Sequence, residues 1–348
     1  MKRFKMILAA AIALLMLAGC GGQTIDTAGS DSTAAENSGT EENGQGAGTQ
    51  SSQAEHVFNV NIPGIDAENY PYIDGSTANH PLLARIYQEI CHVDRETAES
   101  FVDFDLGSTG SIWENILEPE KHGYESGKRP DLLIVYEAPE DVKEMYADVM
   151  DHFEIEPLGR DGLVFLANAA NPVESLTTEQ LYGIYTDKIR NWSEVGGNDE
   201  AIVPFQRNED SGSQTLFMKL LMKGEKPMDP PKELQVSTMG GLIDSVAAFD
   251  GSGSALGYSV YYYANLMYGN PNLKLLSVDG VAPSNKSIET GEYPLTNDFY
   301  VVIRADEPED SPVRALRDWL LTDEGRALLE AENYVWARGL SSSSSVPR

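Results

Sequence analysis

Strands and helices alternate along most of this chain, and that order limits its fold more than any other feature of the sequence. The clearest strand is 131–136, a continuous apolar run typical of strands buried on both faces of a parallel sheet. The same pattern continues with a second apolar run at 162–167 and with helical periodicity at 81–90, 139–150, 214–222 and 312–321. This alternation predicts an α/β architecture with parallel sheets.

The N-terminus has the layout of a targeting segment. Basic residues precede an uncharged apolar run at 6–18, which is too short to span a bilayer comfortably, since that takes ~20 residues. The run ends at Leu17-Ala18-Gly19-Cys20, with small residues before the cysteine. This pattern resembles a bacterial lipoprotein signal, so residues 1–19 are predicted to be removed and Cys20 to carry lipid. The alternative is an ordinary secretory signal with an incidental cysteine.

The stretch that follows is predicted to be a disordered tether. Residues 21–55 consist mainly of Gly, Ser, Thr, Gln, Ala, Asn and acidic residues, with one Ile and no aromatic residue. Such a segment cannot bury enough apolar surface to offset its chain entropy. With the lipidated cysteine, residues 20–55 would hold a folded part at the extracytoplasmic face of the cell membrane. Residues 341–348 are expected to be a disordered tail.

Charge and composition narrow the function. The chain has 55 Asp and Glu against 25 Lys and Arg, giving a formal net charge of −30. This balance argues against nucleic-acid binding, which needs clustered cations. Two Cys and five scattered His leave no pattern for a disulfide framework or a metal site, and no cofactor is expected. Cys91 is expected to be a small hydrophobe at the end of a helix.

Three hydroxyl-rich turns stand at predicted helix starts, at 74–77, 107–111 and 211–213. Free backbone N–H groups and the positive end of the helix dipole point into such turns, so together the turns can bind an anion. Arg207 lies four residues before Ser211 and can supply a bidentate cation. The pattern therefore favours an anion site.

Simpler explanations of the same residues stay open. Ser and Thr are the preferred N-cap residues, so each turn can be no more than a helix cap. Arg207 can pair with a neighbouring acid, Glu209 or Asp210. Signatures of catalysis are weaker still: the chain has no Gly-x-Ser-x-Gly between a strand and a helix and no Walker-type loop. No enzymatic activity is expected.

Six short blocks carry a family resemblance: Leu176-Thr177-Thr178-Glu179-Gln180-Leu181, Lys188-Ile189-Arg190-Asn191-Trp192, Arg207 through Ser213, Leu256-Gly257-Tyr258, Tyr293-Pro294-Leu295 and Asp323-Glu324-Gly325. This series resembles the phosphate-binding proteins of ABC-type phosphate transporters, a type 2 periplasmic-binding-protein family. The likeness is specific in residues 160–335 and loose in the N-terminal third.

The resemblance implies a two-lobed fold with a ligand cleft between the lobes. Lobe one would comprise 56–160 and 259–340, and lobe two 161–258. The resemblance also implies an oxyanion held by Arg207, Ser211, Gly212 and Ser213 from lobe two, by Ser76 and Thr77 from lobe one, and by Ser108 or Thr109 from the second turn. Ser213 departs from the family pattern, which usually has Thr at this position.

Glu137 matches the family's acidic residue, which accepts a hydrogen bond from protonated phosphate. The strand before it looks one residue longer than usual. The implied function is that of a monomeric solute-binding lipoprotein, which captures phosphate or a similar small oxyanion and delivers it to the permease subunits of an ABC importer. Two alternatives stay open: an extracellular hydrolase acting on a phosphorylated substrate, and a sensor or adhesion module on the same scaffold without transport.

Overall fold

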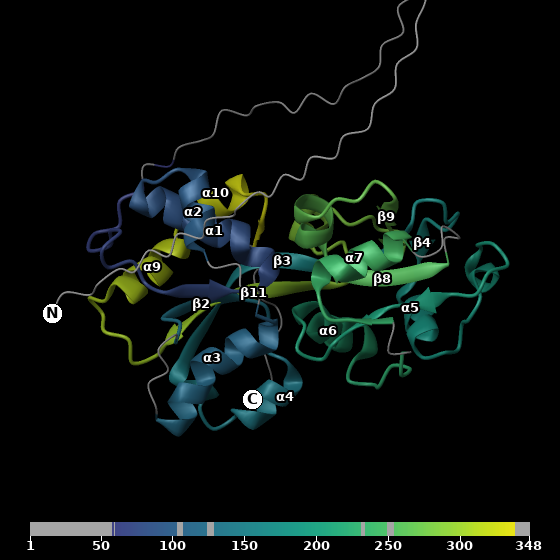
Figure 1. The fold of residues 1–348 in the computed structure, drawn as a ribbon, viewed down its shortest axis with the longest axis horizontal. Coiled ribbons are helices and arrows are strands. Elements are labelled where there is room, and N and C mark those ends of the chain that lie inside the picture. Colours follow the sequence, from purple (N-terminus) through teal and green to yellow (C-terminus); the bar gives the residue numbers. More distant parts are fainter. Residues whose placement is uncertain are drawn as a thin grey trace, which may run out of the picture. The chain divides into compact units, whose positions relative to one another are not determined.

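The structure, a computed structural model, describes Phe58 and residues 60–102, 107–123, 129–230, 234–248 and 254–337. The predicted signal peptide, the lipidation site Cys20, the tether and the tail 341–348 lie outside the described residues. The described part is an α/β fold, in which helices cover a central sheet (Figure 1).

The central sheet is mixed. Its strands follow the order β1-β2-β11-β3-β8-β5, and β9 and β12 also pair with β3. These strands are β1 (Ile73–Gly75), β2 (Leu132–Val135), β3 (Phe153–Asn168), β5 (Val203–Pro204), β8 (Ala255–Val260), β9 (Leu273–Leu275), β11 (Thr296–Arg304) and β12 (Val335–Trp336). The predicted α/β class is confirmed. The prediction of parallel sheets holds for β1–β2 and β5–β8 but is wrong for β3, which runs antiparallel to β11 and β8. An apolar run shows burial but not strand direction.

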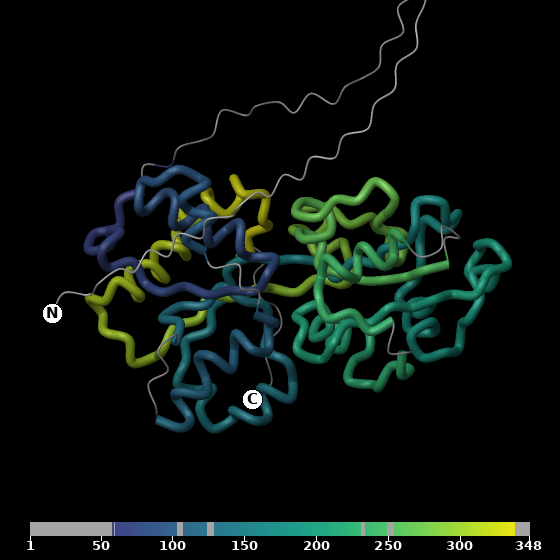
Figure 2. The backbone as a smooth tube through the Cα atoms, in the orientation of Figure 1, coloured from purple at the N-terminus to yellow at the C-terminus, as the bar shows by residue number. Residues whose placement is uncertain are grey.

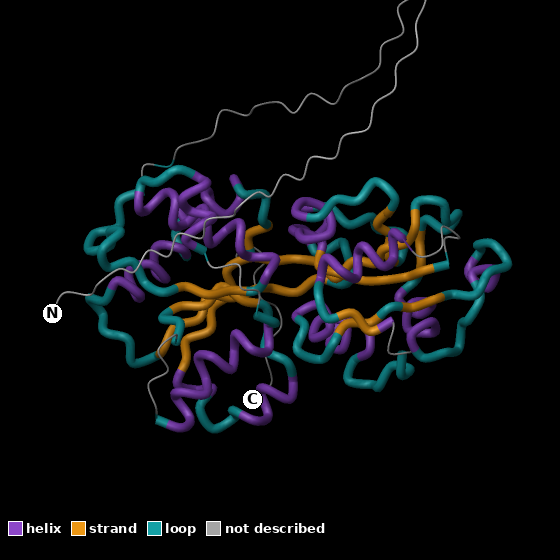
Figure 3. Tube along the Cα trace, viewed as in Figure 1, coloured by secondary structure: helices purple, strands orange, loops and turns teal. Residues whose placement is uncertain are grey.

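Strand β3 belongs to two groups of elements. Its residues Phe153–Gly162 pair with β11, and Leu163–Asn168 pair with β8 and β9. Lobe one is the group around β1, β2, β11 and the first part of β3, and lobe two is the group around the second part of β3, β8 and β5. Strands continue from one set of helices to the other (Figure 3), and the tube can be followed across in Figure 2. The predicted two-lobed fold is confirmed.

The helices flank the two parts of the sheet. In lobe one, α1, α2 and α10 lie on one side of the strands and α3 and α4 on the other (Figure 1). Lobe one contains η1 (Thr77–Asn79), α1 (His80–Cys91), α2 (Arg95–Phe101), α3 (Thr109–His122), α4 (Glu140–Met145), η2 (Met150–His152), α9 (Pro312–Leu320) and α10 (Asp323–Ala331). Lobe two contains α5 (Thr178–Tyr185), η3 (Trp192–Val195), α6 (Gly212–Leu216), η4 (Phe217–Met222), α7 (Met239–Ala248) and η6 (Tyr263–Met267), and α8 (Asn285–Thr290) comes before β11.

Two small sheets complete lobe two. Strand β6 (Gln206–Arg207) pairs with β7 (Gln235–Val236), and β4 (Ser175–Leu176) pairs with β10 (Ser277–Val278). Together with β9, β10 places residues 273–278 beside strands of the segment assigned to lobe two, although the predicted boundary returned the chain to lobe one at 259. The lobe boundaries themselves stay a prediction.

Strand β2 explains how the core positions the site. All four of its residues are buried: Leu132 and Ile134 pack in the cluster that includes α1, and Leu133 and Val135 in the cluster that includes α3. Because β1 and β2 are parallel neighbours, both strands end at the same edge of the sheet. Ser76 follows β1 and Tyr136 follows β2 at this edge.

The packing of β3 against β11 leaves no room for a side chain at Gly159. A Cβ added there would lie 2.1 Å from Cζ of the fully buried Phe299. We expect Gly159→Ala to destabilise the protein by about 1–3 kcal/mol, the usual cost of overpacking a dense core. The measurement is chemical denaturation at neutral pH. Gly269→Ala is the control, because the nearest atom to its added Cβ is 3.7 Å away, and equal stability of the two variants would contradict the prediction.

Candidate functional site

The three hydroxyl-rich turns differ in what their side chains do. Ser108 precedes α3, and its hydroxyl oxygen accepts a hydrogen bond from the backbone N–H of Ser111 at 3.2 Å. Ser76 precedes η1 and Ser211 precedes α6, but neither side chain makes a capping hydrogen bond. Capping, the simpler explanation, therefore accounts for Ser108 but not for Ser76 or Ser211.

The hydroxyl groups of the other turns converge on one place. Ser76 Oγ lies 3.0 Å from Thr109 Oγ1, and Ser211 Oγ lies 3.0 Å from Ser213 Oγ. A Cβ added to Gly212, between those two serines, would lie 2.5 Å from Thr109 Oγ1. All four hydroxyl-bearing residues are buried. We call these five residues, Ser76, Thr109, Ser211, Gly212 and Ser213, the hydroxyl niche.

A backbone contact holds the two lobes together at the niche. The N–H of Gly110, in the first turn of α3, donates to the carbonyl oxygen of Asp210 at 2.9 Å. The loop before α6 therefore lies against the start of α3. Thr77 and Ser108 are half-buried neighbours of niche residues, and their contact with a ligand stays a prediction.

Arg207 lies beside the niche and is buried, with 6% of its surface exposed. Its Nη1 donates to Ser213 Oγ at 3.4 Å, and Nε and Nη2 donate to the carbonyl oxygens of Val236 and Ser237 at 3.0 and 3.1 Å. Burial lowers the pKa of Arg207 to about 10, and at neutral pH the guanidinium stays charged. Within the described residues it forms no ion pair, so the predicted alternative of pairing with a neighbouring acid is not observed.

Glu137 follows Tyr136 at the end of β2 and is held by two lysines. Lys143 Nζ lies 2.6 Å from Oε1, and Lys219 forms an ion pair with Oε2. Burial raises the pKa of Glu137, but the hydrogen bonds and charges of the two lysines outweigh it and the net shift is downward. Glu137 is therefore an ionised carboxylate, and each of its oxygens already accepts a hydrogen bond from an ammonium group.

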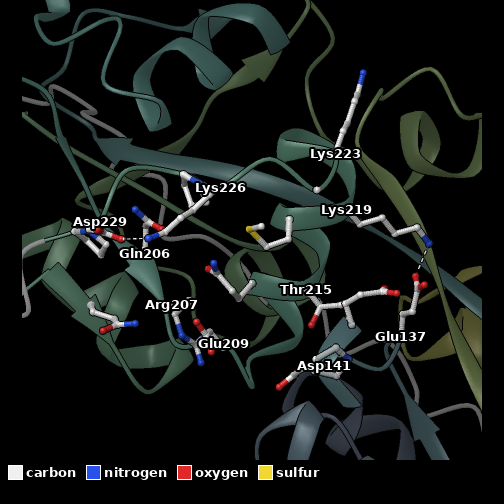
Figure 4. A pocket seen from close by; sticks show the side chains of 18 of the residues that line it. Glu137, Asp141, Gln206, Arg207, Glu209, Thr215, Lys219, Lys223, Lys226 and Asp229 are labelled. Atoms are coloured by element: carbon white, nitrogen blue, oxygen red, sulfur yellow. Dashed lines mark hydrogen bonds and ion pairs between the residues drawn. The ribbon is translucent and has the colours of Figure 1, made fainter. Parts of the chain in front are cut away.

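A cavity of about 820 Å³ adjoins the niche. Arg207 and Gln206 stand at one end, and Lys219 and Glu137 at the other (Figure 4). Of the residues predicted to bind the ligand, Arg207 and Glu137 line this cavity, whereas the niche hydroxyls do not. Arg207 and Glu137 thus line one cavity. The predicted hydroxyl groups instead pack against one another in the hydroxyl niche, outside the lining of that cavity.

Sequence reasoning missed a buried carboxylate behind the niche. Asp161 in β3 is 3% exposed and accepts hydrogen bonds from Tyr136 Oη at 2.7 Å and from the backbone N–H of Tyr262 at 3.2 Å. Burial raises the pKa of Asp161 to about 6. Tyr136 in turn donates its backbone N–H to Ser76 Oγ at 3.1 Å. The signal available in the sequence was an acidic residue directly before the apolar run 162–167.

The described residues contain neither a metal-binding cluster nor a helix able to cross a membrane. No group of three or more His, Cys, Asp or Glu side chains in this part of the chain is arranged to hold a metal ion. Among the helices of the same residues, none combines the length and apolar character that crossing a membrane requires.

Two lobes that share a long strand, with a compact polar site at their contact, define a class of two-lobed ligand-binding proteins. A family model described as "PBP superfamily domain" matches residues 137–324, more than half of the chain. The chain belongs to this superfamily.

Curated relatives agree with this assignment. Over 136 residues the chain is 32% identical to the phosphate-binding protein PstS of Bacillus subtilis, a match that covers 38% of this chain and 42% of the relative. Over 179 residues it is 25% identical to PstS of Borreliella burgdorferi, covering 50% and 63%. The chain thus matches less than two thirds of the length of both relatives.

Solved structures show the same fold. A substrate-binding protein of a phosphate ABC transporter from Clostridium perfringens, solved with bound phosphate, superposes with a TM-score of 0.58 at 21% identity, covering 78% of this chain and 100% of that one. An ABC-type phosphate transport receptor from Vibrio cholerae gives 0.54 at 24% identity, covering 76% and 98%. The predicted resemblance to type 2 periplasmic-binding proteins is confirmed.

The raised pKa of Asp161 predicts a pH-dependent stability. A carboxyl with a folded-state pKa of about 6 and a usual value of 3.8 stabilises the fold below pH 4 and loses that contribution as the pH rises through 6. We expect the unfolding free energy of wild type, relative to Asp161→Asn, to fall by at most about 3 kcal/mol between pH 4 and pH 7. Urea denaturation of both proteins across this pH range measures the difference in their unfolding free energies. The contributions of other titrating groups are the same in both proteins and cancel in this difference. A difference independent of pH would contradict the prediction.

Proposed function

We propose that this protein binds phosphate or a similar small oxyanion at the hydroxyl niche and delivers it to an ABC importer. The observation that carries the proposal is the buried guanidinium of Arg207, which has no carboxylate partner among the described residues. A buried charge is costly unless a counter-charge or hydrogen bonds compensate it. An oxyanion beside Ser213 would supply that counter-charge.

The niche offers neutral donors around this single cation. A hydroxyl group can rotate to donate to an anion, and the paired serines 211 and 213 lie next to Arg207. Backbone N–H groups in the first turn of α6 add donors, and the starts of α3 and α6 add the positive ends of helix dipoles. A tetrahedral ion matches such a set, because its oxygens accept from several directions at once.

The lobes are proposed to close on the ligand by a hinge motion about the strands that they share. Thr77 and Ser108 complete the proposed ligand set, and the family resemblance implies Glu137 as a further ligand. For Glu137 this assignment requires an oxygen to turn from a lysine to the ligand, because both of its oxygens accept from ammonium groups.

The cellular setting is proposed from the sequence and the relatives together. The lipoprotein-like signal supports an anchor on Cys20 at the extracytoplasmic face of the cell membrane, and the names of the relatives support phosphate as the ligand. The protein would act as a monomer that hands its ligand to permease subunits. No covalent step is part of the proposal.

Arg207→Ala tests the proposal directly. We expect phosphate affinity to fall by about a hundredfold, since hydrogen bonds to a charged group contribute about 1.5–3 kcal/mol each. The melting temperature without phosphate should change little, because losing an unpaired buried charge offsets losing its hydrogen bonds. Calorimetric titration with phosphate, sulfate and molybdate measures the affinity. A large fall in melting temperature without phosphate would instead make Arg207 structural, and no heat from wild type with any anion would refute the function.

Gly212→Ala tests whether phosphate binding requires the close contact between the turn before α6 and the start of α3. Its added Cβ would meet Thr109 Oγ1 at 2.5 Å, so the turn before α6 must move away from α3. We expect phosphate affinity to fall at least tenfold by the same titration, since displacing a binding group by about 1 Å is costly. Gly269→Ala, at an exposed turn, is the control. Unchanged affinity in Gly212→Ala would place the ligand elsewhere.

A further inference from the structure

Lys219 lies on the same helical segment as the anion loop. Segment α6 begins at Gly212 and continues without a break into η4, which contains Lys219. Any movement of this segment therefore carries Ser213 of the niche and the Lys219 ammonium together. Lys219 also lines the cavity beside the niche (Figure 4).

Lys219 donates to two side chains that belong to lobe one. Its ammonium donates to a carboxylate oxygen of Glu137 and to Asn297 Oδ1, the latter at 2.9 Å. Glu137 follows Tyr136, whose backbone N–H donates to Ser76 Oγ. The Lys219–Glu137 pair thus joins the helix that carries one half of the niche to the strand end that holds the other half.

Two other lysines of the cavity, Lys226 and Lys143, form ion pairs within one lobe. Lys226 pairs with Asp229, three residues along the same lobe, and Lys143 pairs with Glu137 and Glu140 within lobe one. Lys143 nevertheless matters for the bridge: by binding Oε1 it orients the carboxylate so that Oε2 faces Lys219. The arrangement is a carboxylate held between two ammonium groups, one from each lobe.

We propose that Lys219 is a positioning residue for the oxyanion site, which aligns the two halves of the hydroxyl niche through its ion pair with Glu137. This inference rests on the proposed function. It assigns Glu137 to closure of the two lobes, in place of contact with the anion. Because its two residues belong to different lobes, the pair stabilises the arrangement in which the lobes meet. Its contribution should therefore raise the affinity for any anion that the niche holds and should not select one anion over another.

The first test compares two cavity lysines in the full chain. With inorganic phosphate as the probe, we expect Lys219→Met to raise Kd about fivefold, as fits a partly exposed ion pair. Lys226→Met removes the same charge and a pair within one lobe, and should change Kd less than twofold. Lys219→Arg should restore most of the affinity. Equal losses in the two Met variants would overturn the proposal, since they would show a general effect of charge.

The second test is a double-mutant cycle with Glu137→Gln. If the two residues act as a pair, Lys219→Met combined with Glu137→Gln should bind phosphate no more weakly than Lys219→Met alone. Additive losses would overturn the pair. Glu137→Gln should also leave the ratio of phosphate to sulfate affinity unchanged, and a shift in that ratio would show that Glu137 contacts the anion.

Failure of phosphate binding and failure of the Lys219–Glu137 bridge are distinguishable by experiment. If wild type binds no phosphate, the proposed function fails and the bridge is then judged by the same cycle on thermal unfolding without added anion. A coupling between Lys219 and Glu137 in that cycle supports the bridge. A coupling indistinguishable from zero overturns it.

Discussion

The structure is organised around one buried positive charge that has no negative partner among the described residues. Arg207 is fixed by carbonyl oxygens of the segment that contains β7 and by one niche hydroxyl, none of which carries a formal charge. Neutral dipoles orient a guanidinium without neutralising it, so its field stays directed at the niche. The charge is therefore fixed in place before any ligand binds, as the proposed anion site requires, and in that proposal the neighbouring glycine and serines supply fit and further donors.

A second buried charge ties this site to the strands that join the lobes. Asp161 sits in β3 where its pairing passes from β11 to β8, and it accepts from Tyr136 and from Tyr262 just beyond β8. Tyr136 reaches Ser76, so the carboxylate links the crossing strands to the niche through one side chain. Movement of the lobes about β3 would therefore shift Ser76 through these hydrogen bonds. Asp161, Tyr136 and Ser76 are thus connected by hydrogen bonds to the strand about which the lobes would move.

The sequence predicted the parts of the site that depend on local chemistry. The run at 131–136, the loop from Arg207 to Ser213 and the helix starts all follow from patterns within a few residues, and the structure brings Ser76, Thr109 and Gly212 together as the anion hypothesis required. Strand direction, the pairing of Lys219 with Glu137 and the role of Asp161 could not be predicted, because each depends on partners far along the chain. Lys219 and Glu137 are 82 residues apart, and no local pattern links them.

The strong negative charge of the chain fits an anion site of this kind. A net charge of −30 repels an approaching anion at long range, but at physiological salt this repulsion is screened beyond about 8 Å. Within that distance an anion at the proposed site would meet Arg207, neutral hydroxyls and helix N-termini, while the lysines of the cavity offset its acidic residues, Glu137 among them. Short-range donors can therefore hold an anion on an acidic protein, and the surrounding charge mainly sets how fast it arrives. Affinity and encounter rate are governed by different residues, so salt should alter the association rate more than the dissociation rate.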